Sequence, residues 1–158
     1  MPRKVTKALV REAAPDRKYG NQQVTRVINR VMIDGKKQTA ERLVYEGMEI
    51  AAKKLKVESP LEVFEKALGN IRPHLETRSR RVGGANYQIP FEVKGQRQNH
   101  LMTMWFVNAA RARKGIGMSD RIAMELVDAF NGTGTAVKKR EDAHKMAESN
   151  RAFAHFAR

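Results

Sequence analysis

The chain has no cysteine, a single tryptophan and only 17 acidic residues in a length of 158. The absence of cysteine excludes disulfide bonds, zinc sites with thiolate ligands and thiol catalysis. No apolar run approaches the roughly 20 residues of a membrane-spanning helix, and the first residues lack the apolar stretch of a signal peptide. We therefore expect a cytoplasmic protein without a membrane-spanning segment.

Sequence patterns of known catalytic sites are also missing. The four histidines are far apart and form no HExxH motif, and the glycine pairs form neither a P-loop nor a GxGxxG fingerprint. No serine lies in a nucleophile-elbow context. The acidic pair Glu141 and Asp142 follows a basic trio, as is common in helix charge patterning. We expect neither an enzyme nor a bound cofactor or metal ion.

What the sequence has in excess is positive charge. Lysine and arginine total 31 against 17 acidic residues, which gives a formal net charge of +14. A compact domain with this excess repels itself, so the charge is expected to serve a polyanionic partner. An anionic membrane surface is the second candidate after nucleic acid, and we expect nucleic acid and no membrane.

The spacing of apolar residues predicts a mainly α, single-domain protein of about six helices. A chain of 158 residues can bury roughly 70% of its unfolded surface in one core. Ser59-Pro60-Leu61-Glu62 is a helix start, with serine as N-cap and proline in the first turn. The expected helices span about 21–33, 40–51, 59–71, 96–113, 119–131 and 136–154.

Two further segments complete the predicted organisation. Residues 1–20 form a basic N-terminal tail with prolines at positions 2 and 15, and such a tail is expected to stay mobile until it meets its anion. Residues 21–158 form the helical domain. A β-hairpin at about 74–91 is expected to protrude from it between the third and fourth helices.

The hairpin is the most informative part of the chain. Gly83 and Gly84 supply the positive φ of a two-residue turn. The first strand carries three arginines, which can pair with phosphates, and the second carries Tyr87, which can stack on a base. The alternative is an ordinary hairpin whose charge only prevents aggregation at its edge. The segment alone does not separate these interpretations, but the net charge favours binding.

The helix expected at 96–113 has a polar stripe. Its members recur at steps of three or four and so share one face; they are Arg97, His100, Met104, Asn108 and Arg111. We expect this face to contact phosphate and ribose, although a merely solvated face is the alternative. Trp105 lies in an apolar run and is expected to anchor the core.

Positive charge gathers in the tail, at helix ends and on the hairpin, where loops can bring clusters together without disturbing the core. The candidate nucleic-acid-binding residues are these basic side chains and the hairpin tyrosine: Arg3, Lys4, Lys7, Arg11, Lys36, Lys37, Arg78, Arg80, Arg81, Tyr87, Arg97, Arg111, Arg113, Lys114, Lys138, Lys139 and Arg140.

Two other functions are compatible with a basic helical chain. The short turn from Ile33 to Lys37 between two helices is typical of a DNA-binding helix-turn-helix protein. However, the following helix carries Glu41, Glu46 and Glu49, which disfavour a recognition helix. A basic RNA-modifying enzyme is the second alternative, and the sequence offers neither a cofactor motif nor a convergent acid–base group for it.

Three long motifs, in order and at the right distances, resemble the family of the seventh protein of the bacterial small ribosomal subunit. They are the stretches 29–37 (NRVMIDGKK), 76–90 (ETRSRRVGGANYQIP) and 133–148 (TGTAVKKREDAHKMAE). The resemblance implies a helical domain with a protruding hairpin that binds the 3′ major domain of 16S rRNA and nucleates assembly of the subunit head.

The same resemblance implies roles for particular residues. Lys36 and Lys37, the hairpin arginines, and the trio that begins the last helix would meet rRNA phosphates. The hairpin and last helix would border the exit-site tRNA and the mRNA path. Neighbouring proteins of the head and platform would include the ninth and eleventh of the subunit.

Overall fold

A computed structural model describes residues 13–157 of the chain. Its elements are α1 (Gln22–Val31), α2 (Lys37–Leu55), α3 (Pro60–Ile71), β1 (Leu75–Val82), β2 (Ala85–Glu92), α4 (Gly95–Ala112), α5 (Met118–Phe130), α6 (Thr135–Ser149) and the 3-10 helix η2 (Arg151–Ala157). The predicted mainly α fold, with one antiparallel hairpin between the third and fourth helices, is confirmed. None of the helices described is long and apolar enough to cross a membrane.

Local sequence signals explain where the first helices begin. The side chain of Asn21 accepts a hydrogen bond from the backbone N–H of Gln23 and so caps α1. Ser59 accepts from the N–H of Glu62 at the start of α3, which has proline in its first turn. Both starts agree with the sequence prediction because these caps depend on neighbouring residues alone.

The helical core is centred on the packing of α2 against α5. Gly47 of α2 makes this close approach possible, because a Cβ there would lie 2.7 Å from the Cγ2 atom of Ile122. The largest fully buried core side chains are Phe64, Phe106 and Ile28. Trp105 is partly buried and packs against this core, as expected.

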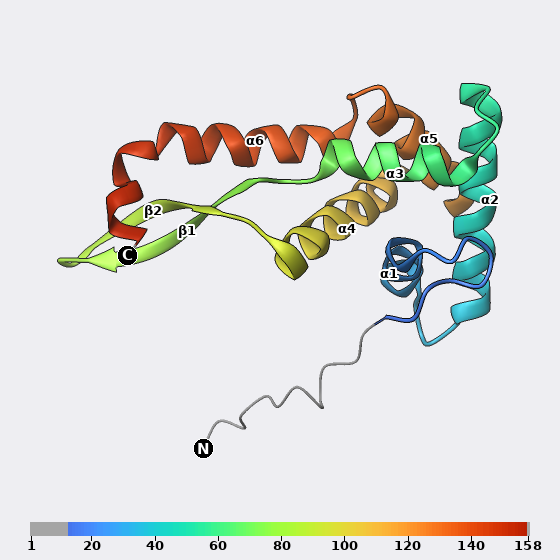
Figure 1. The fold of residues 1–158 in the computed structure, drawn as a ribbon, viewed down its shortest axis with the longest axis horizontal. Helices are drawn as coiled ribbons and strands as arrows, with labels where there is room; N and C mark the ends of the chain where they lie inside the picture. Colours follow the sequence, from blue (N-terminus) through green and yellow to red (C-terminus); the bar gives the residue numbers. More distant parts are fainter. Residues whose placement is uncertain (1–12, 158) are drawn as a thin grey trace, which may run out of the picture.

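The hairpin extends away from the helical body (Figure 1). Its turn residues Gly83 and Gly84 have φ values of +58° and +91°, which glycine adopts without strain. In Figure 1, α6 runs alongside the hairpin, and η2 turns back from the end of α6 onto the hairpin. Thr77 of β1 donates a hydrogen bond to the Sδ atom of Met146, at 3.2 Å, which ties α6 to the strand.

The helix expected over 136–154 is wrong at its C-terminal end, because α6 stops at Ser149. The side chains of Ser149 and Asn150 bond back to the carbonyls of Lys145 and Met146 and so compete with further helical hydrogen bonds. Ala154, at the end of the expected helix, is consequently exposed and belongs to η2.

Residues 16–20, which the sequence analysis placed in the tail, pack on the domain. Asp16 accepts hydrogen bonds from the backbone N–H groups of Lys18, Tyr19 and Asn21 and from the Tyr45 hydroxyl. Burial alone would raise the pKa of Asp16, but these hydrogen bonds outweigh it and hold the pKa below its ordinary value. Tyr45 belongs to α2, so its hydrogen bond holds the turn against that helix.

Candidate nucleic-acid interface

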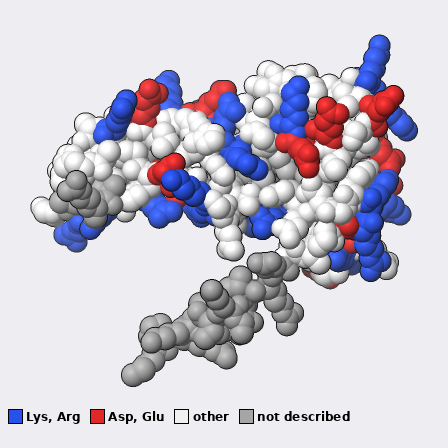
Figure 2. All heavy atoms as spheres, in the orientation of Figure 1, with Lys and Arg blue, Asp and Glu red and all other residues white. Residues whose placement is uncertain are grey.

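Basic side chains are spread over the face of the molecule shown in Figure 2 and do not gather in one patch there. In the view of Figure 2, lysine and arginine stand out along several edges, with acidic side chains between them. Of the candidate residues, Arg3, Lys4, Lys7 and Arg11 lie outside the described residues. The remaining candidates belong to the α1–α2 loop, the hairpin, the two ends of α4 and the start of α6.

The α1–α2 loop presents the first cluster. Asp34 and Gly35 have φ values of +54° and +72°, and this left-handed backbone turns the chain tightly before α2. Lys36 is exposed, and the half-exposed side chain of Lys37 lies 3.7 Å from the partly buried carboxylate of Glu41, one helical turn on. Ion pairs between residues four apart on a helix are weak, so Lys37 can exchange this partner for a phosphate.

The C-terminal end of α4 lies beside this loop. Arg111 donates hydrogen bonds to the carbonyls of Arg30 and Val31, the last residues of α1, at 3.0 and 3.4 Å. The guanidinium therefore stabilises the C-terminal end of α1, where a positive charge is favourable. Lys114, just beyond α4, is exposed.

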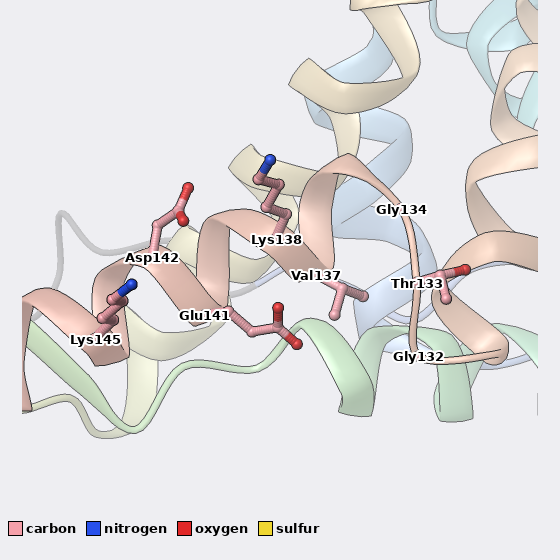
Figure 3. A pocket seen from close by; sticks show the side chains of 8 residues that line it. All are labelled: Gly132, Thr133, Gly134, Val137, Lys138, Glu141, Asp142 and Lys145. Atoms are coloured by element: carbon pink, nitrogen blue, oxygen red, sulfur yellow. The ribbon is translucent and has the colours of Figure 1, made fainter.

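The start of α6 presents the second cluster. Gly134, with φ of +97°, precedes the helix, and Lys138 and Lys139 in its first turns are exposed. Figure 3 shows Lys138 and Asp142 pointing to one side of α6, whereas Glu141 points to the side where α3 lies. Lys138 thus shares its side of α6 with Asp142 and not with Glu141.

Two of the predicted binding residues, Arg113 and Arg140, are mostly buried against partners within the protein. Arg113 donates to the Oε2 atom of Glu125, at 3.1 and 2.7 Å, and also to Asp128. Arg140 donates to the carbonyl of Asn70 at the end of α3. Each of the two arginine side chains is only 26% exposed, so the structure assigns both to the stability of the domain.

Glu125 is a structural residue that was not predicted from the sequence. Its side chain is fully buried, with one oxygen bound to Arg113 and the other accepting the backbone N–H of Ala136 at 3.0 Å. It therefore links the end of α4 to the start of α6. The available signal was the position of one acid in the apolar stripe of α5, between Ile122 and Ala129.

The hairpin register divides its three arginines between two faces. Arg80 lies opposite Tyr87 and Arg81 opposite Asn86. Because successive side chains of a strand point to opposite faces, Arg78 and Arg80 share the face of Tyr87, and Arg81 lies on the other. The three guanidinium groups cannot all meet one phosphate backbone on one side of the ribbon.

A second buried acid holds the root of the hairpin. Glu76 of β1 is 7% exposed and accepts hydrogen bonds from Arg78 of the same strand and from Arg97 of α4, the latter at 3.0 Å. Burial alone would raise the pKa of Glu76, but the two arginines outweigh it and lower that pKa. The pair thus orients the hairpin against α4, and Arg78 and Arg97 remain about half exposed.

The predicted stacking residue Tyr87 is half buried. Its ring lies 5.1 Å from the ring of Phe153 and 5.5 Å from that of Phe156, both of η2. Arg80 donates a hydrogen bond to the carbonyl of Phe156 at 2.8 Å. The C-terminal segment therefore covers part of the surface that the sequence assigned to nucleic acid.

The polar stripe of α4 is solvent-facing over most of its length. The side chains of Arg97, His100, Asn108 and Arg111 are exposed, and Met104 is half-buried. The two arginines at its ends have the protein partners described above.

The clusters do not converge on a single patch. In Figure 1 the α1–α2 loop, the start of α6 and the free end of the hairpin lie at three separate parts of the molecule. This arrangement suits a large polyanion that touches the protein at several places, and it does not suit a small anionic ligand.

The contact between α6 and the hairpin root depends on an unprotonated histidine. The backbone N–H of His74 donates to the Nε2 atom of His144 at 3.0 Å. Burial lowers the pKa of His144, and the positive charges of Arg140 and His74 lower it further. The folded protein thus keeps His144 neutral at a pH at which the unfolded chain already binds a proton.

This histidine is expected to make the folded protein less stable in mild acid. The free energy of unfolding should fall as the pH drops through the ordinary histidine value of 6.5. Urea unfolding of the wild type and His144→Gln between about pH 7.5 and about pH 5 measures this, and the variant should lose less stability. His100→Gln, at an exposed position on α4, is the control. Parallel pH profiles of wild type and His144→Gln would contradict the assignment.

Comparison with known proteins gives matches over nearly the whole chain. The family model described as Ribosomal protein S7p/S5e matches residues 2–151. "Small ribosomal subunit protein uS7" of Kosmotoga olearia is 55% identical over 150 residues, which cover 95% of this chain and 96% of that protein. Proteins of the same name from Dinoroseobacter shibae and Solidesulfovibrio magneticus are 54% and 51% identical, covering 92% and 99% of this chain and 93% and 99% of their own lengths.

Proposed function

The chain belongs to the ribosomal protein S7p/S5e family, and from that premise we propose that it is a primary binder of the 3′ major domain of 16S rRNA. It is a structural, non-enzymatic protein of the small ribosomal subunit. The observation that carries the rRNA proposal is the set of separate, exposed basic clusters on one helical core, with a hairpin extending from it.

The proposed mechanism is electrostatic clamping of several RNA helices. Phosphates that meet at a junction repel one another, and lysines at separate places on a rigid body neutralise them and release condensed counterions. Shape and phosphate position provide most of the specificity, because the deep groove of A-form RNA hides the base edges. The residues proposed for these contacts are Lys36, Lys37, Arg78, Arg80, Arg81, Arg97, Arg111, Lys114, Lys138 and Lys139, with Arg3, Lys4, Lys7 and Arg11 of the tail.

The family resemblance supports a more specific place in the subunit. We propose that binding of this protein nucleates assembly of the subunit head. The hairpin and α6 would border the exit-site tRNA and the mRNA path, with the ninth and eleventh proteins of the subunit as neighbours. The elongated pairing of hairpin and α6 in Figure 1 supports this, because it reaches well beyond the core.

Binding to an RNA fragment of the 3′ major domain at near-physiological salt tests the proposal. We expect tight binding that survives excess tRNA and excess duplex DNA, measured by filter retention or fluorescence polarisation. Binding that either competitor abolishes would overturn the specific rRNA role and leave a general polyanion binder. Preferential displacement by duplex DNA would favour the helix-turn-helix alternative.

A further inference from the structure

We propose that the free end of the β-hairpin carries a binding site for one unpaired RNA nucleotide, and that Arg151–Ala157 occupies this site while RNA is absent. We call the pair Arg80 and Tyr87 the tip site. The inference rests on the RNA-binding function proposed above and adds to it a site, its ligand class and an internal competitor.

The tip site is a cross-strand pair. Arg80 of β1 and Tyr87 of β2 are directly opposite in the hairpin register, so their side chains lie together on one face. A cation and an aromatic ring at this spacing match the two recognisable parts of a nucleotide, its phosphate and its base. The position is at the free end of the hairpin, where a single-stranded segment can approach.

In the described structure η2 makes both contacts that a nucleotide would make. The rings of Phe153 and Phe156 lie 5.1 and 5.5 Å from that of Tyr87, where a base would stack. The carbonyl oxygen of Phe156 accepts a hydrogen bond from the Nη1 atom of Arg80 at 2.8 Å, where a phosphate oxygen would lie. One short segment thus imitates the base and the phosphate together.

A nucleotide offers Arg80 a stronger acceptor than the carbonyl of Phe156. That carbonyl is neutral, whereas a phosphate oxygen is charged, and charge-assisted hydrogen bonds are roughly twice as strong as neutral ones. Base stacking on a tyrosine at least matches the tilted contacts between phenyl rings. Exchange of η2 for a nucleotide therefore keeps an aromatic contact on Tyr87 and replaces the carbonyl of Phe156 with a charged acceptor.

The structure also shows why η2 can leave. It is a 3-10 helix of seven residues, a conformation with poorer hydrogen-bond geometry than the α-helix. Phe153 and Phe156 are its half-buried side chains, whereas Arg151 and His155 are exposed. Segments with so little buried surface open at low free-energy cost. The segment contains no acidic residue, so RNA would not repel it after release.

The test uses the full-length chain and a fluorescent oligouridine of about ten nucleotides, a length typical of one single-strand binding surface. Phe153→Ser/Phe156→Ser retains every charge of the segment and removes its two rings. Without the two rings, η2 should leave the tip site in a larger fraction of the molecules, and only those molecules can bind the oligonucleotide. We therefore expect the variant to bind about fivefold more tightly than wild type. Adding Tyr87→Leu should abolish the gain.

A matched control replaces two exposed apolar side chains elsewhere. Ile116→Ser/Met124→Ser changes residues that are each 39% exposed and lie outside the hairpin and η2. This variant should bind like wild type. In a second measurement, hydrogen exchange of wild type should show that the amides of residues 151–157 lose protection when oligouridine binds.

The outcomes separate this inference from the proposed function. If wild type binds the 3′ major domain fragment but the double phenylalanine variant binds oligouridine no more tightly than wild type, the tip site is wrong. Unchanged exchange over residues 151–157 in saturating oligouridine would also overturn it. If wild type fails to bind the fragment, the proposed function itself fails and the tip site fails with it.

Discussion

Replacement of Glu125 by alanine is expected to lower the free energy of unfolding by about 3–5 kcal/mol. The carboxylate is fully buried, and its removal leaves Arg113 with only the partly exposed Asp128 as a described acidic partner. It also leaves the N–H of Ala136 at the start of α6 without its acceptor. Loss of the partner of a buried charge costs more than the pair itself contributes. Urea unfolding of both proteins measures the difference.

Glu141→Ala is the matched control for this prediction. Glu141 also pairs with an arginine, at 3.3 Å, but its side chain is 60% exposed. Exposed pairs contribute about 1 kcal/mol or less, so the free energy of unfolding of this variant should stay close to that of wild type.

A double-mutant cycle tests the pair directly. Arg113→Leu and Glu125→Ala should show a coupling energy of about 0.5–3 kcal/mol. A Glu125→Ala protein as stable as Glu141→Ala would contradict the assigned role.

The triple variant Lys36→Ala/Lys138→Ala/Lys139→Ala is expected to weaken binding to the 3′ major domain fragment by about two to three orders of magnitude at roughly 0.1 M salt. Within residues 13–157 the structure assigns these three lysines no ion pair, so their loss leaves no buried charge behind. Each phosphate contact contributes about one unit to the salt slope, so the slope should flatten by about three units. Titration at several salt concentrations measures both quantities.

A second triple variant removes the same charge from another place. Lys53, Lys54 and Lys56 lie exposed at the C-terminal end of α2, away from the proposed contacts. Their replacement by alanine should change the affinity by less than about tenfold, because salt screens charges that do not touch the RNA. Equal losses from the two triples would mean that only net charge matters, and the proposed residue assignment would then be wrong.

The parts of the fold that were predicted correctly depend on short-range chemistry. Asn21 and Ser59 each cap a helix through a backbone N–H two or three residues ahead. Gly83 and Gly84 form the hairpin turn through their own backbone freedom. Each of these caps and turns involves only residues close together in the sequence, so it can be predicted without knowledge of the rest of the chain.

The candidate interface was less predictable because its chemistry depends on distant partners. Arg113 and Arg140 look like phosphate-binding residues in basic clusters, yet they bind Glu125 and the carbonyl of Asn70. Tyr87 looks like an exposed stacking residue, yet η2 covers part of it. A basic cluster in the sequence shows how charges are spaced along the chain. It does not show which carboxylate or carbonyl group will lie beside each arginine in the folded protein.

The sequence by itself determined the fold class, the hairpin, the family and the excess of positive charge. The fold class, the hairpin and the charge follow from apolar spacing, local caps, glycine backbone freedom and composition, none of which requires a long-range contact. The family follows from the resemblance of three long motifs. Only the tertiary structure decided which basic side chains are available to RNA, how the hairpin arginines divide between two faces and what covers Tyr87. A basic side chain is available to RNA only if it is neither buried nor paired with an acid of the protein. Burial and pairing between distant segments arise only when the chain packs.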